Sequence, residues 1–136
     1  MVNVNRGFWG VAVGNHDKSE IILTQKYYAF GQFSKYIRPG YTIISGNDNC
    51  VAALDKSRKK LVIVVTNTDG TDKNVGFNLF SFSKVGNTVK VIRTSGSSSN
   101  GEKWAELDPI STNVKGFNAV LKANSITIYI VDGVEA

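Results

Sequence analysis

The sequence contains few residues of the kinds that form covalent or catalytic frameworks. Its one cysteine, Cys50, excludes an intrachain disulfide, and the apolar neighbours Val51 and Ala52 indicate a buried thiol. Its one histidine, His16, has no recognisable serine or cysteine nucleophile motif around it, so a Ser-His-Asp or Cys-His site is not expected. No apolar run approaches the roughly 18 residues that a membrane-spanning helix needs, and we expect no membrane partner.

Glutamate is also scarce. The four glutamates are Glu20, Glu102, Glu106 and Glu135. Enzymes that hydrolyse glycosidic bonds usually oppose two carboxyl groups across the bond, about 5 to 9 Å apart. Glu102 and Glu106 flank one short strand on the same side, where charged residues usually face solvent. We therefore do not expect Glu102 and Glu106 to form a catalytic pair.

One polar segment has the composition of a metal loop. Residues 67–72 read Asn-Thr-Asp-Gly-Thr-Asp, but Gly76 stands where the closing glutamate of an EF-hand loop belongs. A solvated hairpin loop explains the segment better than a calcium site. We expect no metal site and no cofactor.

The net charge of +5 comes mostly from lysines that are scattered along the chain. The single basic run, at residues 58–60, lies between two apolar segments, and no motif of stacked aromatic residues stands beside it. We interpret the run as a solvated hairpin loop and expect no nucleic-acid partner. An adaptor that binds anions through these lysines is the least favoured hypothesis.

The N-terminal third contains two short apolar runs and one helical pattern. Residues 7–13 and 21–23 are strand candidates, separated by a turn-prone polar segment. Thr24 suits a helix N-cap, and Tyr27, Phe30, Phe33 and Ile37 recur at helical spacing until residues 39–40, Pro-Gly, stop the pattern. The pattern predicts one amphipathic helix over residues 24–38.

Beyond Gly40 the helical period does not return, and β-branched runs alternate with turn residues. The eight expected strands lie at 41–45, 50–54, 61–66, 75–82, 89–94, 103–107, 116–121 and 125–131. The turns between them are rich in Gly, Asn, Asp and Ser, which favours antiparallel pairing. The fold class is therefore mainly β, an antiparallel β-sandwich of about eight strands with one N-terminal amphipathic helix.

Alternation along the strands predicts which side chains share a face. Ile126, Ile128 and Ile130 should lie on one side of the last strand, in the core between the two sheets. Alternation places Trp104 with Glu102 and Glu106 on a polar face. A tryptophan there is either a platform that stacks on sugar rings or a structural residue that packs on a neighbouring element.

The helix and its exit carry the resemblance to a known family. Residues 26–41 read KYYAFGQFSKYIRPGY, and residues 33–40 match the string with which the last barrel helix of glycoside hydrolase family 30 enters its side β-sandwich. The segments at 61–67, 93–95 and 123–127 also resemble strands of that sandwich. The sequence thus resembles the C-terminal part of a family 30 enzyme over most of residues 8–131, closest to the endo-β-1,6-galactanase-like members.

The resemblance implies a division of the chain and a set of partners. Residues 1–40 would be the remnant of the last βα unit of a (β/α)₈ barrel, and residues 41–136 the side domain. Arg6, Phe8 and Trp9 would border the substrate cleft, and Trp104 is the fourth candidate for substrate binding. The implied partners are a polysaccharide, galactan or xylan, and the catalytic barrel, in an extracellular enzyme. The glucuronoxylanase loop Arg-Ser-Tyr-Gly is not reproduced at residues 6–10, which puts acidic-xylan specificity in doubt.

Three functions follow from these observations. The leading one is a non-catalytic portion of a polysaccharide-degrading enzyme, because the glutamates of that family lie on earlier barrel strands. The alternative is a stand-alone carbohydrate-binding module that stacks sugars on Trp104 and Trp9. The third is the anion-binding adaptor. Without a barrel the helix exposes an apolar stripe, which predicts self-association, a partner, or repacking of the helix onto the sandwich.

Overall fold

The computed structural model describes residues 12–15, 17–47, 49–97, 100–113 and 116–136. In chain order the elements are β1 (Ala12–Asn15), β2 (Glu20–Leu23), α2 (Gln25–Ser34), β3 (Thr42–Asn47), β4 (Cys50–Asp55), β5 (Lys60–Asn67), β6 (Lys73–Asn78), β7 (Thr88–Ser95), β8 (Glu102–Ser111), β9 (Gly116–Leu121) and β10 (Ser125–Asp132).

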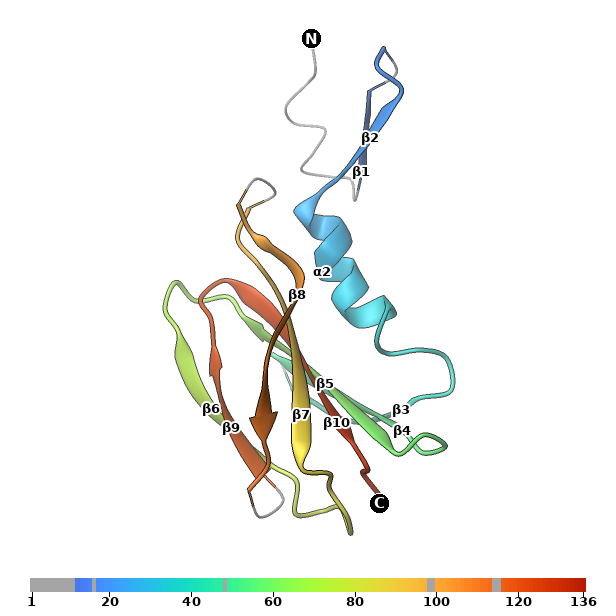
Figure 1. The fold of residues 1–136 in the computed structure, drawn as a ribbon, viewed down its shortest axis with the longest axis vertical. Coiled ribbons are helices and arrows are strands. Elements are labelled where there is room, and N and C mark those ends of the chain that lie inside the picture. Colours follow the sequence, from blue (N-terminus) through green and yellow to red (C-terminus); the bar gives the residue numbers. More distant parts are fainter. Residues whose placement is uncertain (1–11, 16, 48, 98–99, 114–115) are drawn as a thin grey trace.

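Eight of these strands form a sandwich of two antiparallel sheets. The larger sheet has six strands in the order β3-β4-β5-β10-β7-β8, and the smaller one pairs β6 with β9. The remaining strands, β1 and β2, pair in a hairpin that projects away from the sandwich and leads into α2 (Figure 1). The predicted fold class, a sandwich of about eight strands with one N-terminal helix, is confirmed.

The helix is shorter than its sequence pattern. It ends at Ser34, and one further turn follows in which the backbone N–H of Ile37 donates to the carbonyl of Phe33. Pro39 sets only the outer limit of the helix, because a proline disfavours the helical conformation of the residue before it, Arg38. The prediction that the helix continues to Arg38 was therefore wrong by one turn.

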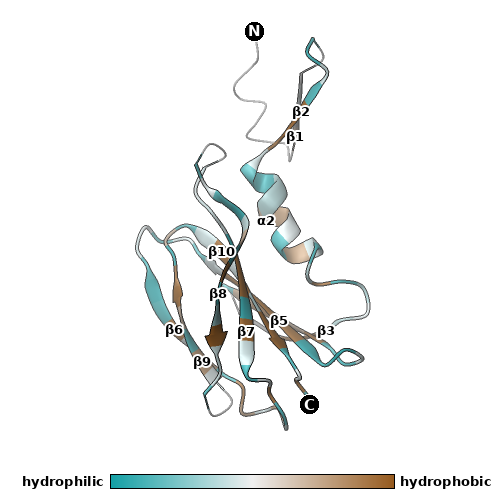
Figure 2. Ribbon diagram, viewed as in Figure 1, coloured by the Kyte–Doolittle hydropathy of each residue, from teal (hydrophilic) through white to brown (hydrophobic). Residues whose placement is uncertain are grey.

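The central strands of the six-stranded sheet, β5, β10 and β7, are buried on both faces. Side chains on one face pack against β6 and β9, where the rings of Phe77, Phe117 and Tyr129 lie 4.8 to 5.4 Å apart. Side chains on the other face lie under α2 and its exit, with Val62, Val64, Ile92, Ile128 and Ile130 at the centre. Figure 2 shows the resulting concentration of hydrophobic residues in the central strands. The architecture is therefore three-layered: helix, large sheet, small sheet.

The isoleucines of β10 lie in a different layer from the one that their sequence suggested. Ile126, Ile128 and Ile130 share a face, as alternation predicted, but that face lies under α2 and not between the sheets. Tyr129 and Val131 occupy the space between the sheets instead. The layer assignment was wrong because both faces of this strand are apolar, and alternation alone does not distinguish two buried faces.

The basic run forms the expected hairpin loop between β4 and β5. Asp55 accepts hydrogen bonds from the backbone N–H groups of Ser57 and Arg58 and from the Ser57 hydroxyl, which closes the turn. Lys59 pairs with Glu135, and Lys60 with Asp132 at 3.8 Å. The run is thus offset by local carboxylates, as a solvated loop predicts.

The segment with the composition of a metal loop, residues 67–72, forms hydrogen bonds to the turn between β9 and β10. The side-chain amide of Asn67 donates to the carbonyls of Thr71, Leu121 and Lys122, at 3.0 to 3.2 Å. Asp72 accepts from the backbone N–H of Ala123 at 2.9 Å. Within the described ranges no group of His, Cys, Asp and Glu is arranged to hold a metal ion. The side chains here connect loops to each other.

Candidate functional site

Helix α2 packs on the sandwich through buried amides. Gln32 is fully buried, and its Nε2 donates to the carbonyls of Ile92 in β7 and Ile126 in β10, at 3.2 and 2.9 Å. Two turns earlier, Gln25 Nε2 donates to the carbonyls of Ser95 and Glu102, both at 2.9 Å. Residues seven apart lie on one side of a helix. The face of α2 that meets the sandwich is therefore held by hydrogen bonds to backbone carbonyls of β7, β8 and β10.

Trp104 anchors the same helix from β8. Its indole Nε1 donates to the carbonyl of Tyr28 at 2.8 Å, and its ring contacts those of Tyr27 and Tyr28, with centroids 5.4 and 5.0 Å apart. A Cβ atom at position 31 would lie 2.0 Å from Trp104 Cζ2, so only glycine fits between helix and indole. Gly31 and Trp104 form a specific contact between α2 and the sandwich.

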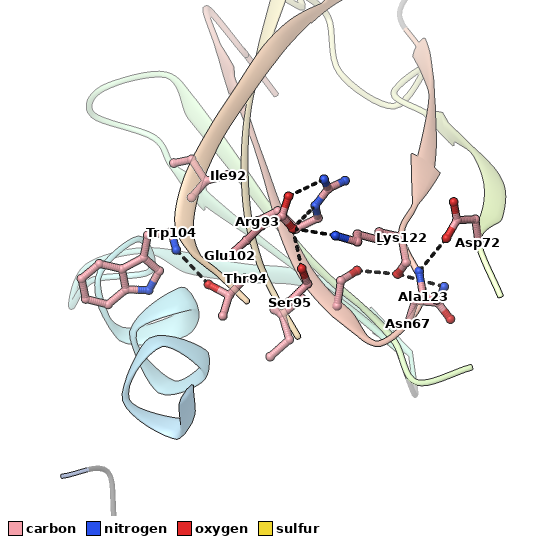
Figure 3. A network of polar contacts seen from close by, with 12 residues as sticks. Asn67, Asp72, Ile92, Arg93, Thr94, Ser95, Glu102, Trp104, Lys122 and Ala123 are labelled. Carbon is pink, nitrogen blue, oxygen red and sulfur yellow. Dashed lines mark hydrogen bonds and ion pairs between the residues drawn. The ribbon is translucent and has the colours of Figure 1, made fainter. Parts of the chain in front are cut away.

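A bulge in β8 turns Trp104 toward the helix. Arg93 pairs with Ala105, but Ser95 pairs with Glu102, so β8 contains one extra residue in this interval. Trp104 takes a left-handed backbone conformation, φ 49°, which is uncommon for a bulky residue and typical of such an irregularity. Figure 3 shows the outcome: the indole lies beside α2, and Glu102 points toward Arg93 and Ser95. The prediction that Trp104 and Glu102 share a face was wrong because the bulge breaks the alternation.

Glu102 is locked in a polar network on the inner side of the sheet. Arg93 donates from Nε and Nη2 to its two carboxylate oxygens, both at 2.7 Å, and Ser95 Oγ and Lys122 Nζ add contacts. The hydrogen bonds from Arg93 hold the pKa of Glu102 down at about 2, and Ser95 and Lys122 act in the same direction. Such a carboxylate stays ionised and is unsuited to donate a proton.

Glu106, the other candidate carboxylate, lies on the opposite face of β8. In the register of β7 and β8, Glu106 lies opposite Ile92, whose side chain is under α2. Its carboxylate is 3.6 Å from Lys90 Nζ. Glu102 and Glu106 therefore do not face each other across a space that a sugar occupies. A glycosidase pair needs its two carboxyl groups opposed across one space, and these two lie on different faces of β8.

The outer side of the helix and hairpin carries exposed apolar residues. Phe30 is 68% exposed, Ile21 77% and Ile22 55%, with Leu23 and Phe33 less so. We call these five residues the docking face: Phe30 and Phe33 lie on α2 away from Gln32, and the other three lie on β2, where successive side chains point to alternate sides of the strand. Hydrophobic residues clustered like this on adjacent elements mark interaction surfaces more often than free surface. The apolar stripe that the sequence predicted is thus partly exposed in the structure.

We expect the isolated chain to self-associate through the docking face. We expect the weight-average mass in sedimentation equilibrium to rise with protein concentration, because two copies bury these residues against each other. The double substitution Phe30→Ser/Phe33→Ser should keep the chain monomeric without altering its fold. A mass that rises equally in both proteins would mean that another surface makes the contact.

A groove runs beside Trp104, between α2 and β8. Its volume is about 640 Å³, and Tyr27, Phe30 and Arg38 are among its lining residues. Lys35 Nζ lies 4.5 Å from the Trp104 ring centroid, a cation–π contact that occupies the space above the ring. Trp104 is therefore engaged by its neighbours in this structure, and its role as a sugar platform stays a prediction.

The other residues singled out in the sequence are Arg6, Phe8, Trp9, His16 and Cys50. Arg6, Phe8 and Trp9, and His16 with them, lie outside the described residues. Cys50 is half-buried, and burial raises the pKa of its thiol, which makes it a poor nucleophile. Among the described residues, no helix is long and apolar enough to span a membrane.

Sequence reasoning missed the residues that position the helix. Gln25 and Gln32 are polar, so the apolar periodicity of Tyr27, Phe30 and Phe33 drew attention to the opposite side of α2. The spacing of seven between the two glutamines and the glycine beside the second were the available signals. Both signals become informative only once it is known which face of the helix meets the sheet, because buried amides need backbone groups to pair with.

Comparison with known proteins identifies where this architecture occurs. The endo-β-1,6-galactanase of Hypocrea rufa is 29% identical over 129 residues and is matched by 93% of this chain. The glucuronoxylanase XynC of Bacillus subtilis strain 168 is 28% identical over an alignment of 127 residues, and the match covers 85% of this chain. The crystal structure of Xyn30A, a family 30 subfamily 8 xylanase from Clostridium acetobutylicum, superimposes with a TM-score of 0.68 at 30% identity over 88% of this chain. The resemblance to glycoside hydrolase family 30 is confirmed.

The match covers only part of each relative. The chain spans 27% of the length of each of the two curated relatives and 30% of Xyn30A. No protein-family model matches the sequence. The chain therefore resembles the C-terminal part of family 30 enzymes, a helix followed by a β-sandwich, and the activity of the complete enzymes does not follow from the match alone.

Proposed function

We propose that this chain is the non-catalytic C-terminal portion of a family 30 glycoside hydrolase and that it buttresses a catalytic barrel. In this proposal residues 1–40 are the remnant of the last βα unit of the (β/α)₈ barrel, and residues 41–136 are its side domain. The docking face carries the proposal: five apolar side chains on β2 and α2 are exposed.

The orientation of α2 supports a partner on the docking face. A surface helix normally turns its apolar side to the core and its polar side to water. Here the buried Gln32 faces the sandwich, and Phe30 and Phe33 face outward. An apolar partner on the outer side gives the helix two buried faces, which is the situation of a helix between a barrel and a side domain. The sandwich then fixes the helix, and the helix supports the barrel.

The nature of the substrate is part of the same proposal. The relatives are named for endo-β-1,6-galactanase and xylanase activities, so the substrate that we propose for the parent enzyme is a polysaccharide of the galactan or xylan type. An enzyme of this kind works where such polymers lie, and we propose an extracellular location. The chain itself contributes packing to the enzyme and no catalytic group.

A chimera tests the barrel contact. The segment of Xyn30A that this chain matches is replaced by this chain, and xylan hydrolysis and thermal unfolding are measured for the fusion. We expect a soluble, active chimera. The substitution Phe30→Ser/Phe33→Ser should then destabilise the chimera by about 3 kcal/mol or more, as expected when aromatic side chains are removed from a buried interface.

The same substitution in the isolated chain provides the control. There both side chains are exposed, so the free energy of unfolding should change by no more than about 0.5 kcal/mol. Phe80, which is 64% exposed on the other side of the molecule, gives the matched variant Phe80→Ser, with little effect in either protein. Equal effects of Phe30→Ser/Phe33→Ser in the chimera and the isolated chain would rule out the barrel contact.

A stand-alone glycan-binding role is the second candidate. The groove beside Trp104 favours it, since aromatic side chains and a volume of about 640 Å³ suit a sugar. Isothermal titration with β-1,6-galactan, xylan and β-glucan should give saturable heat that Tyr27→Ala removes, because Tyr27 lines the groove. Heat that is unchanged in Tyr27→Ala would place any binding elsewhere on the chain.

A further inference from the structure

The outer face of the small sheet carries a row of asparagines. Asn74 and Asn78 lie on β6 and Asn118 on β9, all exposed, on the side of the sheet away from the core. The register pairs Gly76 with Asn118, which places the Asn118 side chain between the other two. Asn74 and Asn78 are four residues apart, about 13 Å along an extended strand. The row is therefore long enough to contact several units of a chain molecule.

Glycines make this face flat. A Cβ atom at position 76 would lie 3.1 Å from Asn118 Oδ1, so glycine there leaves room for the amide to lie across the ladder. Gly116 faces Asn78 in the register and also has no side chain. A strand interior is an unfavourable place for glycine unless another group approaches the backbone closely. At both positions the group that comes close belongs to this chain, Asn118 Oδ1 at Gly76 and the Phe77 carbonyl at Gly116, the first residue of β9, and neither glycine adds a side chain to the outer face.

The face is also hollowed. Two adjoining depressions of about 650 and 500 Å³ share Gly76, Ile110 and Asn118, so they form one continuous groove. Ile110 belongs to β8 and walls the groove on one side, and Phe80, 64% exposed, lies at its end. Binding sites for small ligands typically measure about 300 to 1,000 Å³. We call this feature the asparagine groove.

Charge distinguishes the asparagine groove from the rest of the surface. Of the described residues that line it, none is charged, although the chain carries 16 basic and 11 acidic residues. Figure 2 shows β6 as mostly hydrophilic beside the hydrophobic β9, and the side-chain amides of the groove on these strands belong to Asn74, Asn78 and Asn118. An anionic ligand finds no countercharge there. The complementary ligand is uncharged and rich in hydroxyl groups.

We propose that the asparagine groove binds an uncharged polysaccharide chain. A side-chain amide offers two donors and an acceptor, which matches the alternating donor and acceptor character of neighbouring sugar hydroxyls. The Asn78 carbonyl oxygen is oriented by the backbone N–H of Phe80, at 2.9 Å, which leaves the amide hydrogens for the ligand. The exposed ring of Phe80 stacks on the apolar face of a sugar ring.

The proposal goes beyond the barrel contact and is independent of it. The asparagine groove lies on the small sheet, and α2 with the docking face lies beyond the opposite side of the large sheet (Figure 1). A barrel that covers α2 therefore leaves the groove open. The groove would hold the parent enzyme on its polymer at a place separate from the catalytic cleft.

Affinity electrophoresis of the isolated chain tests the groove. Gels contain β-1,6-galactan, unsubstituted xylan, mixed-linkage β-glucan or the anionic polymer polygalacturonate. We expect retardation by at least one of the neutral polymers, and salt at about 0.5 M should leave it unchanged because the ligand carries no charge to screen. Asn74→Ala/Asn118→Ala should weaken this binding about tenfold, the effect of one or two lost hydrogen bonds.

Matched phenylalanine variants separate this proposal from the barrel contact. Phe80→Ala should weaken glycan binding, and Phe33→Ala, an exposed phenylalanine on the docking face that does not line the groove beside Trp104, should not. Unfolding of each variant in urea shows that the fold is retained. The proposal is overturned if none of the neutral polymers retards the chain. It is also overturned if Asn74→Ala/Asn118→Ala is retarded as strongly as the wild-type chain. Retardation by polygalacturonate alone, abolished by salt, would assign binding to the scattered lysines instead. None of these outcomes changes the expected result for the chimera.

Discussion

Replacing Gly31 with alanine is expected to lower the free energy of unfolding by about 1–2 kcal/mol, although alanine is the better helix former. Helix propensity favours the alanine by about 0.5–1 kcal/mol. Against this, the added Cβ lies 2.0 Å from Trp104 Cζ2, and overpacking of this kind costs about 1–3 kcal/mol. The indole must then move, and its hydrogen bond to the Tyr28 carbonyl is strained or lost.

A double-mutant cycle tests this account of Gly31. In the Trp104→Ala background the clash is absent, so Gly31→Ala should be neutral or stabilising, and the coupling energy between the two positions should approach the cost of the clash. Urea unfolding measures both. A Cβ atom added at Gly70 would have no neighbouring atom within 4 Å, so Gly70→Ala is a control with little effect. Equal effects of Gly31→Ala in both backgrounds would mean that Trp104 does not restrict position 31.

Hydrogen bonds between α2 and the sandwich explain why the helix stays packed on the large sheet. Gln25 and Gln32 provide four hydrogen bonds to strand carbonyls, and Trp104 provides a fifth to the helix backbone. Each contributes about 0.5–1.5 kcal/mol net, and leaving those carbonyls unpaired costs more. The contact is directional, so it fixes the rotation of α2 about its axis. That rotation is what exposes Phe30 and Phe33.

The strands were predictable because their signals are local. The run at residues 116–121 coincides with β9, and the other seven expected sandwich strands differ from the observed ones mainly at their ends. Turn residues and β-branched runs act over a few neighbours, which a single sequence displays. The family string at residues 33–40 was likewise local, and the similarity to Xyn30A supports it.

The faces were less predictable because they depend on partners distant in sequence. Ile128 and Tyr129 are both fully buried, in different layers, and nothing within β10 shows which layer the helix covers. Trp104 changes face because of a bulge that arises in the pairing of β7 with β8. The asparagine groove was also missed, since its three amides come from two strands that are about 40 residues apart along the chain and adjacent only in the sheet. Alternation within one strand contains none of this information.

Acid should weaken the chain partly through Glu102, which is the largest electrostatic effect that we expect. Its pKa is about 2 in the folded chain, against an ordinary value of 4.5, because Arg93 and Ser95 donate to the ionised form. Since the folded pKa is depressed, the stabilisation is complete above pH 4.5 and is lost as the pH falls toward 2. Glu102→Gln should cost about 1.5–3 kcal/mol at pH 7, the value of hydrogen bonds to a charged group.

The difference between the wild-type chain and Glu102→Gln isolates this group from the other carboxylates. Hydrogen bonds from Ser57 and Lys59 also lower the pKa values of Asp55 and Glu135, so the wild-type curve alone reports several groups. The gap between the two chains should be widest near pH 7 and close toward pH 2. Glu106→Gln, which removes only an exposed pair with Lys90, should shift the curve by less than about 1 kcal/mol. Parallel curves of unfolding free energy against pH for wild type and Glu102→Gln would contradict the role of Arg93. They would also contradict the view that this network holds β7 and β8 together beside the Glu102 carbonyl, which accepts from Gln25.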